Sequence, residues 1–215
     1  MKPMPAPAAA LRIATDAMRA PFAGWLRAEG NLLSEPDAGN RHSCSLEAIC
    51  ARLQDAGHRV LGPIASPAIR VDRVVIGPLG ALALQAWGAV DGLTPGSRMR
   101  VDAASVRRDG EAWGPDLIGQ ARICASYLRT LLEDAPGWRA RQPVVTVMLF
   151  EGCAVEQTAD SRNWLWALES GAFEAMLEGR LATTLAAGGH VFDAASIASL
   201  AQRLEQHIGA RAALR

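Results

Sequence analysis

The sequence predicts an α/β protein with a mixed central sheet flanked by helices. Two apolar runs, residues 69–76 and 81–87, are separated by Pro78-Leu79-Gly80, which predicts an antiparallel hairpin. Both runs are apolar nearly throughout, which indicates strands that are covered on both faces. Segments with helical spacing precede and follow the hairpin. Strands followed by a helix, a strand and further helices are typical of a mixed α/β domain.

Before the hairpin, the chain predicts one helix and one strand. Apolar residues recur at helical spacing over residues 45–56. Ser43 or Ser45 can cap this helix, and Gly57 can end it. The stretch 58–65 then predicts a strand that precedes the hairpin.

After the hairpin, short strands come first and helices later. The strands are inferred from alternation or from apolar runs, and the helices from apolar residues three and four apart. In chain order we expect strands at residues 98–101 and 105–108, an Asp109-Gly110 turn, a helix over 115–133, a buried strand over 144–150, a helix over 164–178 and a last helix from Asp193.

The first 40 residues differ in composition from the rest. They form a Pro/Ala-rich arm and linker with a short helix expected around residues 11–28, and residues 41–215 form the main domain. Prolines interrupt the N-terminus, so it lacks a signal-peptide core. No apolar run reaches the roughly 20 residues of a membrane helix. We expect a cytoplasmic protein with no membrane contact.

The composition gives little further indication of function. Half of the 215 residues are hydrophobic, and 22 basic residues balance 22 acidic ones, so no global charge attracts nucleic acid. All basic residues except Lys2 are arginine, so the main domain contains no lysine. The cysteines form no CxxC pair and the histidines are scattered, so we expect free thiols and no metal site. The cysteines are Cys44, Cys50, Cys124 and Cys153.

One stretch carries a family resemblance. Residues 71–88 read VDRVVIGPLGALALQAWG, after a capped helix with an early Glu. A Gly-rich stretch and Trp113 follow, then a helix with Gln120, a buried strand and a closing helix. This order resembles the nuclease-related domain (NERD) of the PD-(D/E)XK nuclease superfamily over about residues 41–208. The resemblance implies a restriction-endonuclease-like fold.

The resemblance also implies a site. In that family an Asp on one strand and a Glu on the next share a divalent ion, and a Lys two residues after the Glu assists. Asp72 matches the first carboxylate, Glu47 the Glu of the first helix, and Gln120 the Gln of the later helix. Gln85 stands in place of the second carboxylate, and Trp87 in place of the Lys.

These two replacements predict a vestigial site. An amide removes one negative charge from the ligands of a hard cation, and Mg²⁺ gives up its hydration reluctantly. We therefore expect no tight metal site, no cofactor and no functional catalytic residue. Mg²⁺ enters only if the chain is an active nuclease with rearranged residues, in which Arg98 or Arg100 supplies charge as a phosphate clamp.

Simpler roles stay open for the same residues. Asp72 can form a strand-edge ion pair with Arg70 or Arg73, and Trp87 can belong to the core. Glu47 near a helix start favours the helix dipole. The two glutamines can be a polar remnant of the cleft and a solvated helix face.

Three functions follow. The first is a catalytically inactive domain that binds DNA or RNA, or serves in assembly, through a basic strip next to two tryptophans that could stack bases. The second is a protein-interaction or scaffold module without nucleic acid, which meets a protein partner or a second copy through Trp164–Trp166. The third is the rearranged nuclease. The basic strip consists of Arg98, Arg100, Arg107 and Arg108, and the stacking tryptophans are Trp87 and Trp113.

Overall fold

The computed structural model describes residues 45–66, 69–114, 116–135, 138, 144–158, 164–189 and 191–212. The helix expected around residues 11–28 and the domain boundary at residue 40 lie outside these residues. Within the described part, none of the helices combines the length and apolar composition needed to cross a bilayer.

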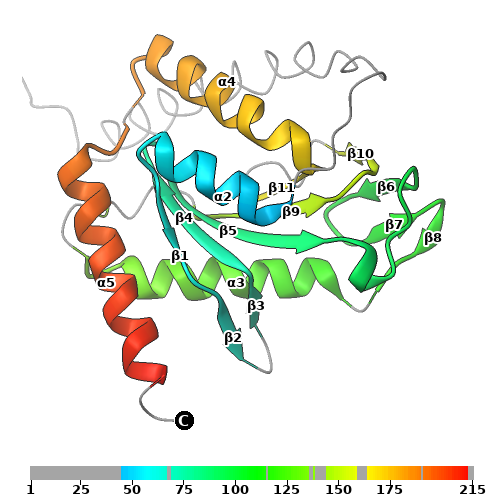
Figure 1. The fold of residues 1–215 in the computed structure, drawn as a ribbon, viewed down its shortest axis with the longest axis horizontal. Coiled ribbons are helices and arrows are strands. Elements are labelled where there is room, and N and C mark those ends of the chain that lie inside the picture. Colours follow the sequence, from blue (N-terminus) through cyan, green and yellow to red (C-terminus); the bar gives the residue numbers. More distant parts are fainter. Residues whose placement is uncertain are drawn as a thin grey trace, which may run out of the picture. The chain divides into compact units, whose positions relative to one another are not determined.

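A five-stranded mixed sheet forms the centre of the fold, as predicted (Figure 1). Its order is β1-β4-β5-β9-β11. Strands β1, β4 and β5 are antiparallel neighbours, and β9 and β11 continue the sheet parallel to β5. The strands are β1 (Arg59–Leu61), β4 (Arg73–Gly77), β5 (Gly80–Trp87), β9 (Val144–Phe150) and β11 (Leu165–Glu169).

The hairpin is confirmed, but it is shorter than predicted. Its register runs from Arg73 opposite Leu84 to Gly77 opposite Gly80. The chain bends at Asp72, and the preceding residues form a separate strand, β3 (Ile69–Val71), that pairs with β2 (Ile64–Ser66). The single strand predicted over residues 58–65 is likewise divided, into β1 and β2. Pro63 lies at that break and has no N–H to continue a ladder.

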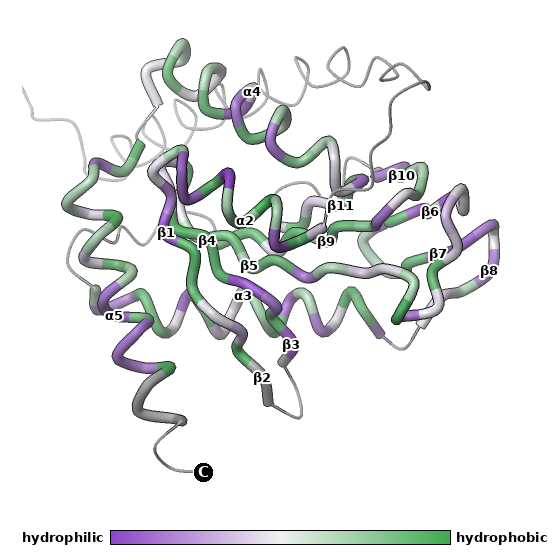
Figure 2. Tube along the Cα trace, in the orientation of Figure 1, coloured by the Kyte–Doolittle hydropathy of each residue, from purple (hydrophilic) through white to green (hydrophobic). Residues whose placement is uncertain are grey.

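Helices cover both faces of the central sheet (Figure 1). On one face, α2 (Leu46–Asp55) and α4 (Phe173–Ala186) pack on Val75, Leu82 and Leu84. On the other face, α3 (Leu117–Leu132) and α5 (Ala194–Ala212) pack on alternate residues of the same strands, such as Val74 and Ala83. Because both faces are covered, β4, β5 and β9 run mostly through hydrophobic residues (Figure 2).

Three helices begin at side-chain caps, and those at Ser45 and Asp193 agree with the sequence-based predictions. The Ser45 hydroxyl accepts a hydrogen bond from the Ala48 N–H at the start of α2. The Asp116 carboxylate does the same for Gly119 at the start of α3. Side-chain caps of this kind satisfy N–H groups that have no partner inside the helix. Asp193 caps α5 through the Ser196 N–H, which confirms the start predicted for the last helix.

A second mixed sheet lies at the carboxyl ends of β5 and β9, in the order β10-β6-β7-β8. Its strands are β6 (Arg98–Val101), β7 (Val106–Arg108), β8 (Glu111–Ala112) and β10 (Ala154–Gln157). Asp109 and Gly110 both have positive φ, as the two-residue turn between β7 and β8 requires. Met99 and Val101 point into a core cluster with α3 and the end of β9, so Arg98 and Arg100 face outwards.

The helix predicted over residues 164–178 is wrong in its first third. Leu165–Glu169 is the edge strand β11, which pairs with β9 in parallel, and a 3-10 turn at Ser170–Ala172 leads into α4. A short apolar run fits a buried strand as well as a helix, and the neighbouring strand decides between them.

Candidate functional site

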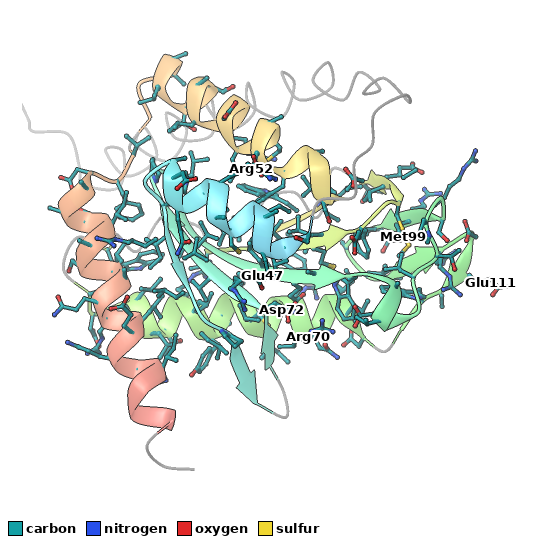
Figure 3. The ribbon with its side chains drawn as sticks, viewed as in Figure 1. Glu47, Arg52, Arg70, Asp72, Met99 and Glu111 are labelled. Carbon is teal, nitrogen blue, oxygen red and sulfur yellow. The ribbon has the colours of Figure 1, made fainter. Side chains whose placement is uncertain are left out.

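Asp72 lies at the bend between β3 and β4, and both of its carboxylate oxygens are engaged. Its Oδ2 accepts the Ala86 N–H at 2.8 Å, and its Oδ1 accepts the Arg70 Nε–H at 3.1 Å. Figure 3 shows Asp72 and Arg70 next to one another below α2. The strand-edge ion pair considered for Asp72 is therefore present.

The guanidinium of Arg70 forms hydrogen bonds with several oxygens of this site. Besides Asp72, it donates to Asp91 Oδ1 at 3.0 Å and to the Ala86 carbonyl at 3.1 Å. Its Cζ also lies 4.6 Å from the centre of the Trp87 ring, a cation–π distance. Burial alone lowers the pKa of Arg70, but the hydrogen bonds to Asp91 and Asp72 outweigh it and hold that pKa above its usual range.

The residues at this site do not fit a divalent ion. Two carboxylate oxygens and one carbonyl are ligands that a hard cation takes. Here they already bind the guanidinium of Arg70, which carries a permanent positive charge. Asp72 also accepts the Ala86 N–H on its other oxygen, so both carboxylate oxygens already have a donor.

Gln85 is buried and acts as a hydrogen-bond donor. It is 1% exposed, and its Nε2 donates to the Arg70 carbonyl at 2.7 Å and to Cys124 Sγ at 3.5 Å. Within the described residues, its Oε1 has no partner. Burial is the main reason that the pKa of Cys124 is raised to about 11, although its hydrogen bond to the Arg70 carbonyl works against it; the thiol therefore stays neutral at pH 7. An ionised Glu at position 85 could not donate to the Arg70 carbonyl, which explains the amide.

Trp87 is half-buried and packs against the core cluster beneath the second sheet, in line with the simpler interpretation. Its ring meets Trp113 edge-on, with centroids 5.4 Å apart, while Arg70 covers its face. Trp113 in turn contacts Phe150 at 6.0 Å. Arg70 and Trp113 therefore cover parts of the Trp87 ring that a nucleic-acid base would need for stacking.

Glu47 and Gln120 do not converge on Asp72. The Glu47 carboxylate accepts from Arg73 at 2.6 Å, and the same guanidinium donates to the Asp72 carbonyl at 2.7 Å. Among the described residues, no hydrogen bond links the Gln120 side chain to this group. Asp72 is therefore paired with Arg70, and Glu47 with Arg73.

Sequence reasoning missed the role of Asp91. It lies in a 3-10 turn, Ala89–Asp91, and also accepts the Gly88 N–H at 3.1 Å. Arg70 was considered only as a pair for Asp72. Asp91 lies 21 residues from Arg70, so no local spacing in the sequence signals this contact.

Three of the four predicted basic residues share one exposed face. Arg98, Arg100 and Arg107 line a hollow of about 770 Å³ on the outer side of the second sheet. Within the described residues, none of their guanidinium groups forms a hydrogen bond or a close ion pair. Arg108 points elsewhere and donates to the Gly92 carbonyl at 2.7 Å, so it does not belong to this group.

Three carboxylates flank the same hollow. Asp102 accepts from the N–H groups of Ala104 and Ser105, and Asp109 accepts the Arg98 N–H. The Ala104 N–H is the main reason that the pKa of Asp102 lies below its usual range. The Glu156 carboxylate, in contrast, forms no hydrogen bond to another described residue.

The tryptophans of the predicted protein-binding region are occupied within the fold. Trp166 is 7% exposed and carries the Arg180 guanidinium 4.1 Å above its ring. Trp164 is half-buried, with Arg122 at 5.0 Å. This region does not offer two free aromatic anchors.

In the part of the chain that is described, no three His, Cys, Asp or Glu side chains gather as a metal site. Comparison with protein-family models, with curated proteins and with solved structures gave no match to this chain.

Proposed function

We propose that this chain is a catalytically silent nuclease-related domain that binds nucleic acid without cutting it. The order of its elements supports a PD-(D/E)XK-like fold. A capped helix (α2), a hairpin (β4 and β5), a Gln-bearing helix (α3) and a buried strand (β9) follow one another as the resemblance implies. The parallel pairing of β5 with β9 through the α3 crossover agrees with this order.

One observation carries the loss of chemistry: the Arg70 guanidinium binds Asp72, Asp91 and the Ala86 carbonyl together. Phosphodiester hydrolysis by a metal-dependent nuclease needs an ion that activates water and neutralises charge. An arginine can neutralise charge, but it cannot bind and activate water as a metal does. Such a site retains the Asp72 carboxylate but does not catalyse phosphodiester hydrolysis.

The exposed arginines of β6 and β7 support the binding part of the proposal. Guanidinium groups suit phosphate oxygens because their N–H donors form a planar fork. Three such groups without close partners lie together on one sheet face, with three carboxylates around the same hollow.

The experiment is a cleavage assay joined to a binding assay. Purified protein is incubated with plasmid, linear and single-stranded DNA and with RNA, in Mg²⁺ and in Mn²⁺. We expect no cleavage by the wild type and retention of nucleic acid that weakens as salt rises. Cleavage that Asp72→Ala abolishes would refute the silent site. Absence of any retention at low salt would refute the binding role.

A further inference from the structure

Two arginines face each other across neighbouring strands of the second sheet. Arg100 of β6 lies directly opposite Arg107 of β7, and Arg98 is two residues before Arg100 on the same face. Directly opposed residues have Cβ atoms about 5 Å apart, and like charges in such positions destabilise a sheet. Among the described residues, no hydrogen bond or close ion pair compensates these guanidiniums. Glu156 opposite Arg100 and Asp102 near Arg107 reduce this repulsion, and an anion held between the two guanidiniums would reduce it further.

The acidic residues around the hollow restrict which anion can enter. Asp102 and Asp109 are held at the rim by backbone N–H groups. Glu156 of β10 lies opposite Arg100 on the other side. An extended polyanion laid over this face would bring some of its phosphates against these carboxylates, whereas a compact anion can contact the arginines alone.

We propose that the hollow binds a terminal phosphate group, with Arg100 and Arg107 as a paired clamp and Arg98 as a third donor. This inference rests on the proposed function and names the ligand group of its binding face. A phosphomonoester carries about −1.5 to −2 charges at pH 7, more than one internal phosphodiester. It also ends the ligand, so further phosphates follow on one side only and fewer of them meet Asp109 or Glu156. The phosphate can belong to a strand end or to a free nucleotide.

Glu156 competes with the ligand for Arg100. Its carboxylate is the one among the three that no backbone N–H of the described residues engages. The negative charge of Glu156 therefore repels the incoming phosphate. Removal of that charge should strengthen phosphate binding.

The test compares labelled single-stranded DNA oligonucleotides that are identical except for a 5′-phosphate or a 5′-hydroxyl. Affinity is measured by fluorescence anisotropy at fixed salt. We expect the phosphorylated strand to bind roughly tenfold more tightly, which is the effect of about one charge-assisted hydrogen bond. Arg100→Ala and Arg107→Ala abolish this preference, and Glu156→Gln increases it. Arg129→Ala on α3, an exposed arginine outside the hollow, preserves it.

Competition with pyrophosphate and with a free nucleoside triphosphate identifies the source of the phosphate. Displacement of the phosphorylated strand by the nucleotide at similar concentration assigns the hollow to small ligands. Displacement only by phosphorylated strands assigns it to strand ends. Equal binding of phosphorylated and hydroxyl strands by the wild type overturns the proposal but leaves binding without cutting intact. A preference that survives in both arginine variants, with unchanged melting temperatures, also overturns it.

Discussion

Replacing Arg70 with alanine tests the contacts on which the silent site depends. The change removes three hydrogen bonds, leaving Asp72, Asp91 and the Ala86 carbonyl without their shared donor. The two aspartate side chains are only 23% and 17% exposed, so water replaces the lost contacts incompletely. The Trp87 ring loses the cation over its face as well.

The size of the effect follows from these exposures. A hydrogen bond to a charged group contributes about 1.5–3 kcal/mol when buried, and less when solvent screens it. The Arg70 side chain is itself 42% exposed, which reduces the total. We expect a loss of about 2 kcal/mol in the free energy of unfolding, or about 4–8 °C in melting temperature for a domain of this size.

The assay is urea denaturation of wild type, Arg70→Ala, Asp91→Ala and the double variant. Arg70→Ala and Asp91→Ala should be coupled by about 1 kcal/mol because each removes a partner of the other. Arg129→Ala serves as the matched control and should change stability by less than about 0.5 kcal/mol. A loss below about 0.5 kcal/mol for Arg70→Ala, with no coupling, would refute the reasoning.

Three further outcomes are expected. Burial lowers the pKa of His58 below 6.5, so the unfolded chain takes up the proton first and stability falls as pH drops below 6.5; denaturation of His58→Phe should show less of this fall. The pKa of Cys124 is raised from 9.0 to about 11, so its contribution to stability is full below pH 9 and is lost as pH rises to about 11; Cys124→Ala should lack this loss in thermal melts. The double reversion Gln85→Glu with Trp87→Lys should not cleave DNA, because Arg70 still occupies Asp72; cleavage by this variant would show that Arg70 is no obstacle.

The hairpin and its helices could be predicted because local signals agreed with the tertiary structure. Pro78-Leu79-Gly80 fixes the chain reversal of the hairpin. The apolar runs before and after this turn require other elements to bury both faces of the strands. The strand at Leu165–Glu169 could not be predicted in the same way. Its residues are apolar enough for a buried helix, and only pairing with β9 selects the strand.

The contacts around Arg70 were much less predictable from the sequence than the hairpin. The hairpin pattern shows directly that Gln85 and Trp87 occupy the two positions that differ from the family pattern. The Arg70–Asp91 contact joins residues 21 apart through the bend at Asp72 and the turn before Asp91. No periodicity connects these positions, because the geometry depends on how β3 leaves the sheet. The same limit applies to Arg108, whose distance from the other arginines follows from strand alternation at the end of β7.

Calorimetric titration of the protein with Mg²⁺ and Mn²⁺ tests the central claim most directly. The wild type should show no binding tighter than millimolar, because the guanidinium of Arg70 already satisfies Asp72, Asp91 and the Ala86 carbonyl. Asp72→Ala should give the same trace as the wild type. Micromolar affinity of the wild type that disappears in Asp72→Ala would contradict the account.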